Sequence, residues 1–151
     1  MINLESILAE WQEDSIIRKD DYEQASMNTP KLHAKYLEYL SLTKLRLKKA
    51  EFDQKTLLKD KYLYYEGKMP EEDMTARGWK YDPFDGLNPK AFTKSTKETF
   101  YNGDKDMQES EIKIQMLKTT IETLSEIVDN LKWRHQTIGN IIRWRQFESG
   151  M

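Results

Sequence analysis

The stretch SEIKIQMLKTTIETLSEIVDNLKWRHQTIGNII, residues 110–142, carries the most regular hydrophobic pattern in the chain. Its apolar residues recur at alternating intervals of three and four positions, which is the spacing of the a and d positions of a heptad. About five heptads of this kind predict a helix that packs along its length against other helices. We call the series the heptad seam; it comprises Met107, Ser110, Ile114, Leu117, Ile121, Leu124, Val128, Leu131, His135, Ile138 and Ile142.

The heptad seam has two candidate packing partners. It can pack within the chain, against a long helix nearer the N-terminus, or between copies of the chain as a coiled coil. A strict 3.5-residue period sustained over this length favours a supercoil, and the polarity of the chain favours burial between copies. We therefore expect a homo-oligomer. The residues assigned to oligomerisation are Ile114, Leu117, Ile121, Leu124, Val128, Leu131, Ile138 and Ile142.

Two more helices and an insert are expected before the heptad seam. The apolar residues of 4–18 have amphipathic helical spacing. After a turn at 26–30, a long helix is expected over 30–65, because Pro30 suits a first helical turn and Gly67 suits the position just past the end. Between this helix and the seam, Gly, Pro and aromatic residues are frequent, which predicts an ordered, irregular insert whose aromatic side chains pack.

The composition narrows the protein class. A length of 151 residues fits one domain, but 38% apolar and 33% charged residues are typical of a protomer that completes its core against partners. The absence of cysteine excludes disulfides, thiolate zinc sites and cysteine nucleophiles. No segment approaches the roughly 18 apolar residues of a membrane span, and the acidic start does not resemble a signal peptide, so we expect a cytoplasmic protein without membrane contact.

The sequence offers little for catalysis. It contains neither a phosphate-binding G-x-x-x-x-G-K-[ST] loop nor a G-x-G-x-x-G motif. His33 and His135 have no second ligand at metal spacing, and His135 falls on the heptad seam, where we expect it to be packed. We predict a protein that is not an enzyme, with no catalytic residues, no metal and no cofactor.

The net charge of −2 conceals blocks of opposite sign. Residues 31–68 hold ten basic and five acidic residues, and residues 132–151 hold four basic and one acidic residue, whereas the segments around them are acidic. Basic blocks are typical of proteins that bind a polyanion. They are equally consistent with solvated helix faces that pair with acidic segments of neighbouring chains.

The first basic block has the composition of a single-strand binding surface. Lysines neutralise backbone phosphates and tyrosines offer flat faces to unstacked bases, whereas residues that read base edges are scarce. The tyrosines are equally consistent with core positions of a helical hairpin, which is what we expect for Tyr36 and Tyr65. Helical spacing aligns Lys44, Lys48, Lys55, Lys59 and Tyr62 on one face, with Arg46 beside them and Tyr64, Lys68 and Lys61 one residue further round. The second block, 132–145, again mixes cations with tryptophans, and contact with a protein partner is as consistent with it as contact with DNA.

The run LKDKYLYYEG, residues 58–67, resembles the basic–Tyr-Tyr–x-Gly motif of the UvsY recombination mediators of T-even-like phages. Similarity extends over about the first 68 residues and the last 20, including the tail RQFESG (residues 145–150), whereas the insert fits poorly. The resemblance implies a ring-like homo-oligomer, hexameric or heptameric, that acts in the host cytoplasm. It also implies single-stranded DNA binding, displacement of the phage single-strand binding protein and loading of a RecA-like phage recombinase.

Within the family motif, the two basic positions implicated in DNA binding correspond to Lys59 and Lys61. Other members carry Arg in place of Lys61 and a small neutral residue in place of Asp60, so weaker binding by each protomer is expected, with several copies compensating.

These observations together predict an all-α fold: a long helical hairpin or bundle with a C-terminal coiled-coil-like oligomerisation helix and a central irregular insert. The expected regions are a DNA-binding helical region (1–68), the insert (69–104) and the oligomerisation region (105–151). The expected function is that of a recombination mediator. The alternative is a structural coiled-coil scaffold that does not bind DNA directly.

Overall fold

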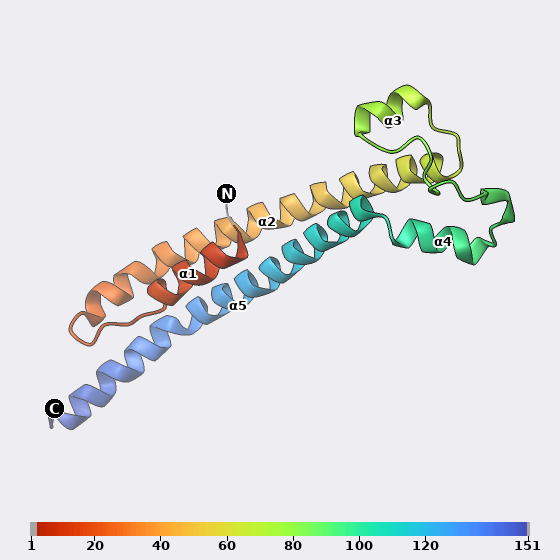
Figure 1. Ribbon diagram of the computed structural model, residues 1–151. Coiled ribbons are helices and arrows are strands. Elements are labelled where there is room, and N and C mark those ends of the chain that lie inside the picture. The colour runs from red at the N-terminus through yellow and green to blue at the C-terminus, as the bar shows by residue number, and fades with distance from the viewer. Residues whose placement is uncertain (1–2, 151) are drawn as a thin grey trace. The chain divides into compact units, whose positions relative to one another are not determined.

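The computed structural model describes residues 3–150, which contain five α-helices, one short 3₁₀ helix and no β-strand (Figure 1). The predicted all-α class is therefore confirmed. The elements are α1 (Leu4–Asp14), α2 (Tyr22–Tyr65), α3 (Glu71–Arg77), η1 (Pro89–Ala91), α4 (Lys94–Asn102) and α5 (Lys105–Glu148).

The chain divides into two compact units, and α2 and α5 each run from one unit into the other. Unit 1 comprises Met1–Leu47 and Met116–Met151, and unit 2 comprises Lys48–Gln115. Among the described residues, no helix has the length and apolar character needed to cross a membrane.

Helix α1 begins at a capping box and ends earlier than expected. The side chain of Asn3 accepts a hydrogen bond from the backbone N–H of Ser6, which satisfies a free donor of the first turn. The helix ends at Asp14 rather than near residue 18. Arg134 donates to the carbonyls of Asp14 (2.8 Å) and Ile16 (3.3 Å), so a side chain from α5 provides hydrogen bonds at this end.

The predicted turn at 26–30 is wrong, because α2 already begins at Tyr22 and Pro30 lies inside it. The side chain of Asp21 accepts from the N–H of Gln24 at 3.1 Å, and this cap starts the helix. The predicted end is confirmed: α2 stops at Tyr65, and Gly67 adopts a positive φ of 72°, a conformation that glycine takes without strain.

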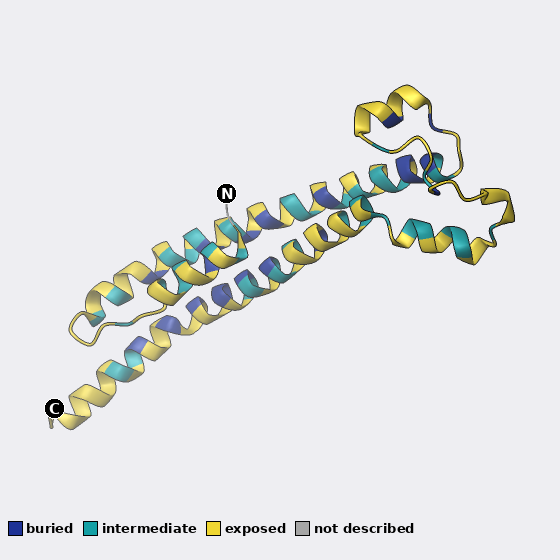
Figure 2. Cartoon of the chain, in the orientation of Figure 1, coloured by how far each residue is buried: buried dark blue, intermediate teal, exposed yellow. Residues whose placement is uncertain are grey.

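The heptad seam is largely covered within the chain. In unit 1, Leu124, Val128 and Leu131 form one core with Ile7 of α1 and Tyr36 of α2. Figure 2 shows buried positions, in dark blue, recurring along α5. Of the remaining seam residues assigned to oligomerisation, Ile114 and Ile138 are buried, Leu117 and Ile121 are half-buried, and Ile142 is 37% exposed. The intramolecular alternative therefore accounts for most of the seam. A contact between copies through these residues stays a prediction.

The prediction that His135 is packed is wrong, because its side chain is exposed and Arg134 is buried instead. The buried face passes from Leu131 to Arg134 and then to Ile138, at intervals of three and four. Arg134 is buried because the end of α1 covers it, where its guanidinium donates to the carbonyls of Asp14 and Ile16.

In unit 2, the insert contains α3, η1 and α4, and its aromatic residues pack as expected. The rings of Phe92 and Phe100 stack at 5.3 Å between centroids, and Phe84 meets both rings edge-on. Tyr65, at the end of α2, lies 5.8 Å from Phe84. This aromatic cluster attaches the insert to α2.

Candidate nucleic-acid interface

An exposed row of lysines and aromatic rings follows α2 within unit 2. Its members recur at intervals of four and three, so an α-helix places them on one face. We call this row the basic stripe; it consists of Lys48, Phe52, Lys55, Lys59 and Tyr62. The two rings are 53% and 54% exposed, for Phe52 and Tyr62 respectively.

Phe52 is a member of the basic stripe that the sequence analysis missed. The Nζ atoms of Lys48 and Lys55 lie 5.1 and 5.6 Å from the centroid of its ring, at cation–π distance. Its position four residues after Lys48 and three before Lys55 was a usable signal. An exposed phenylalanine between two lysines offers a flat face for a base beside two cations for phosphates.

The ion pairs of the basic stripe are weak. The Lys48 ammonium lies 3.9 Å from the Glu51 carboxylate; the Lys48 side chain is largely open to solvent, and Glu51 is half-buried. The Lys59 ammonium lies 3.8 Å from Asp60, and the Lys59 side chain is 70% exposed. Ion pairs at the protein surface contribute about 0–1 kcal/mol, so a phosphate can replace Glu51 beside Lys48 at little cost. Lys59 can likewise turn to a phosphate, because the buried Asp60 keeps its pair with Arg77.

Lys61 lies in a different environment, although it is only two residues from Lys59. Its side chain is 4% exposed, and its ammonium pairs with Asp104 at 3.0 Å and Asp106 at 2.8 Å. The same ammonium lies 3.8 Å from the centroid of the Trp79 ring. Contact with a phosphate requires Lys61 to leave both carboxylates.

The two tyrosines of the motif are likewise occupied by contacts within unit 2. Tyr64 is 5% exposed and donates a hydrogen bond to the carbonyl of Lys80 at 2.6 Å. Tyr65 donates to Asp104 at 2.7 Å. Asp60, also buried, accepts a hydrogen bond from Arg77. We call Asp60, Lys61, Tyr64 and Tyr65, with their partners Arg77, Trp79, Asp104 and Asp106, the anchor cluster.

Electrostatics in the anchor cluster favour an ionised Asp104. Burial alone would raise the pKa of this carboxyl, but hydrogen bonds from Tyr65 and Lys61 outweigh burial and lower the pKa below its ordinary value. Burial, followed by the hydrogen bond to Asp104, raises the pKa of the Tyr65 hydroxyl, which therefore remains a donor. The cluster is thus a charged network inside unit 2.

The other predicted DNA-binding residues are accessible to different degrees. Lys68, just past the end of α2, is exposed. In unit 1, Lys44 is exposed and Arg46 is half-buried. The structure therefore leaves Lys44, Lys68 and the basic stripe open to solvent, and it covers Lys61 and Tyr64.

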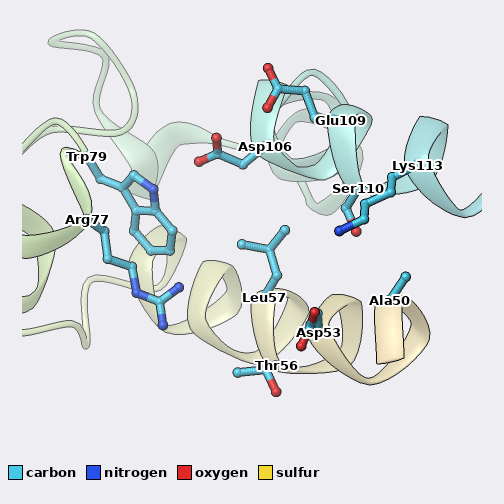
Figure 3. A pocket seen from close by; sticks show the side chains of 10 residues that line it. All are labelled: Ala50, Asp53, Thr56, Leu57, Arg77, Trp79, Asp106, Glu109, Ser110 and Lys113. Atoms are coloured by element: carbon cyan, nitrogen blue, oxygen red, sulfur yellow. The ribbon is translucent and has the colours of Figure 1, made fainter. Parts of the chain in front are cut away.

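An open cavity of about 670 Å³ lies beside the anchor cluster (Figure 3). Arg77 and Trp79 of the insert, Leu57 of α2, and Asp106 and Glu109 of α5 line it together with other residues. With Asp53 also in its lining, carboxylates outnumber cations there. This cavity is unsuited to a phosphate backbone, in contrast to the basic stripe.

The residues of the second basic block, 132–145, also differ in burial. Arg134 is buried under the end of α1, whereas Trp133 and Trp144 are 65% and 61% exposed. Trp144 stacks on the exposed ring of Phe147, and the guanidinium of Arg145 covers the ring of Tyr22 at 4.8 Å.

Cations that alternate with exposed aromatic rings on one helix face are typical of proteins that bind single-stranded nucleic acid. Residues 10–151 match the family described as UvsY, recombination, repair and ssDNA binding protein UvsY. The chain belongs to this family, and the predicted resemblance is confirmed.

Crystal structures of the recombination mediator protein UvsY of bacteriophage T4 share the fold. The lattice type II structure has a TM-score of 0.73 at 23% sequence identity, and the match covers 99% of each chain. The type IV structure has a TM-score of 0.72 at 21% identity, covering 97% of this chain and 99% of that one. The type I structure has a TM-score of 0.71 at 24% identity, covering 95% of this chain and 98% of that one. No curated protein sequence matches the chain.

Proposed function

We propose that the protein is a recombination mediator that binds single-stranded DNA as a homo-oligomer. It loads a RecA-like phage recombinase onto strand covered by the phage single-strand binding protein, without catalysing a chemical step. The observation that carries this proposal is the exposed basic stripe of Lys48, Phe52, Lys55, Lys59 and Tyr62 in a chain of the UvsY family.

The basic stripe supplies the two kinds of contact that a single strand accepts. Its lysines neutralise phosphates and release counterions, so affinity falls as salt rises. Phe52 and Tyr62 stack on unpaired bases, which is tolerant of sequence. Several copies of the stripe in one assembly hold a strand through many weak contacts, which partner proteins can replace one at a time.

Self-association is proposed to involve the C-terminal end of α5. The heptad seam is mostly covered within the chain, whereas Ile142, Trp144 and Phe147 remain exposed there. Large exposed apolar groups on one helix end are typical of a protein–protein contact. A ring of six or seven copies, as the resemblance implies, is compatible with this surface.

Light scattering tests the assembly. The Trp144→Ser/Phe147→Ser variant is expected to give smaller species, whereas Leu87→Ser, which changes an exposed leucine of the insert, leaves the mass unchanged. Unchanged mass in the tryptophan–phenylalanine variant would place the contact between copies elsewhere.

Salt-dependent binding to an oligothymidine strand tests the DNA interface. The Lys55→Ala/Lys59→Ala variant is expected to bind about tenfold more weakly and to flatten the plot of log affinity against log salt by about 1.4, because each lost phosphate contact removes about 0.7. The control, Lys90→Ala/Lys118→Ala, removes two exposed lysines outside the stripe. Negligible binding of the wild type, together with an oligomer mass that changes with salt, would favour the scaffold alternative.

Recombinase loading needs a separate assay. The wild type is expected to speed the assembly of a RecA-like phage recombinase on strand coated with the phage single-strand binding protein, and Lys55→Ala/Lys59→Ala to be slower. A protein that binds the strand but leaves assembly unchanged would contradict the loading role and keep the DNA-binding role.

A further inference from the structure

The segment RGWKY, residues 77–81, repeats the chemistry of the basic stripe in the insert. We call it the α3 exit loop, since it begins with the last residue of α3. Two of its side chains extend into solvent: Lys80 is 78% exposed and Tyr81 is 73% exposed. Neither residue is part of the interface described above, and the packing of the insert leaves both exposed.

The α3 exit loop is held at three points, two through side chains and one through its backbone. Arg77 donates to Asp60, and the Trp79 ring lies 3.8 Å from the Lys61 ammonium. Tyr64 donates its hydroxyl to the carbonyl of Lys80, the residue next to Tyr81. Gly78 has a positive φ of 71° where the chain leaves α3. The loop is thus fixed to α2 through the buried residues of the motif.

Asp60 places the α3 exit loop beside the end of the basic stripe. One oxygen of its carboxylate lies 3.8 Å from the Lys59 ammonium, and the other accepts from Arg77. A cation of the stripe and a cation of the loop therefore share one carboxylate. This contact joins the two surfaces within unit 2.

Nearby carboxylates do not block the loop. Asp82 accepts hydrogen bonds from the backbone N–H groups of Phe84 and Gly86, which partly balance its charge. Asp85 lies 3.3 Å from the Lys80 ammonium, but both side chains are mostly exposed, so a phosphate can replace it.

We propose that the α3 exit loop is a second contact site for single-stranded DNA, in which Lys80 binds a backbone phosphate and Tyr81 stacks on a base. Lys61 and Tyr64 are positioning residues for this site and act on DNA through the loop rather than by touching the strand. The inference rests on the proposed function, because the loop offers the same two kinds of contact, a cation and an aromatic ring, to the same single strand.

The affinity test uses Lys80→Ala/Tyr81→Ala in the full chain. This variant is expected to bind an oligothymidine strand about tenfold more weakly and to lower the salt slope by about 0.7, the value for one phosphate. Leu87→Ala/Lys90→Ala is the matched control, because it also removes one lysine and one large exposed side chain from the insert. An affinity equal to that of the control would overturn the inference.

Photocrosslinking separates this inference from the proposed function. A strand containing 5-iododeoxyuridine is expected to crosslink to Tyr81 as well as to Phe52 or Tyr62, with the sites mapped by mass spectrometry. Crosslinks to the basic stripe without Tyr81 would overturn the loop site alone. The absence of crosslinks at all three rings would count against the proposed function itself.

If Lys61 and Tyr64 position the loop, their substitution should weaken the Tyr81 crosslink but not those of the basic stripe. Lys61→Met is expected to abolish the Tyr81 crosslink and keep those of the basic stripe. Tyr64→Phe, which removes only the hydroxyl that binds Lys80, is a milder variant in case Lys61→Met unfolds unit 2, and it is expected to weaken the Tyr81 crosslink. If both folded variants keep the full Tyr81 crosslink, the positioning role is wrong.

Discussion

Lys59 and Lys61 stand two residues apart on α2, yet 70% of the Lys59 side chain is exposed and only 4% of the Lys61 side chain is. Two residues turn an α-helix by about 200°, so the two side chains leave the helix in nearly opposite directions. One belongs to the basic stripe, the other to the anchor cluster. A basic motif in sequence can thus divide into a surface exposed to solvent and a buried network that stabilises the fold.

The largest expected difference between the two regions is in stability. Lys61→Met is expected to lower the free energy of unfolding by about 3 kcal/mol, because it leaves the buried Asp104 without its cation. Lys59→Met, its matched control on the exposed face, is expected to change it by less than about 1 kcal/mol. Urea unfolding followed by circular dichroism measures both; equal effects would show that the two lysines do not differ in this way.

Removal of a single hydroxyl from each region is expected to change the free energy of unfolding differently. Tyr65→Phe is expected to cost about 2 kcal/mol, since the hydroxyl hydrogen-bonds to a charged, mostly buried carboxylate. Tyr62→Phe removes a hydroxyl from the exposed face and is expected to have almost no effect on stability. The same unfolding measurement applies, and a cost at Tyr62 as large as that at Tyr65 would contradict the assignment.

For DNA binding, we expect a large effect from the exposed basic stripe, although substitutions there change stability little. Phe52→Leu keeps an apolar side chain but loses the flat ring, so it is expected to weaken binding to oligothymidine about fivefold and to change the free energy of unfolding by less than about 0.5 kcal/mol. Fluorescence anisotropy with a labelled strand measures this, with Leu87→Ala as the control. Unchanged affinity would remove Phe52 from the interface.

The pH dependence of stability gives the smallest expected effect. The pKa of Asp104 is lowered in the fold, because the hydrogen bonds from Tyr65 and Lys61 outweigh burial. Its stabilising contribution is therefore complete above the unfolded pKa of about 3.9 and declines as the pH falls through that value and through the lower folded pKa. The stability difference between wild type and Lys61→Met should narrow below about pH 4. A constant difference from pH 7 to pH 3 would contradict the ion pair.

The sequence predicted the helices well where the signals were local. The stop after Tyr65 follows from Gly67, and the helical character of residues 110–142 follows from the heptad spacing. The early start of α2 differs from the predicted start at Pro30, because Asp21 caps the helix one position before Tyr22 and Pro30 lies inside it.

The candidate site was predicted less completely. Lysines at helical spacing indicated the basic stripe but not Phe52, because a phenylalanine at helical spacing is also typical of a buried position and only the fold leaves it 53% exposed. The burial of Lys61 had no local signal, since its carboxylate partners, Asp104 and Asp106, lie more than forty positions away in the chain.

Local spacing, composition and motif were enough to predict the all-α class, the end of α2 before Gly67, the basic character of residues 31–68 and the family. They could not predict which basic residues reach solvent, or that α1 and α2 cover most of the heptad seam in unit 1, because both depend on tertiary packing. The physical reason is that a period specifies which face of a helix is apolar, whereas the partner of that face, or of a buried charge, is chosen by segments distant in the chain.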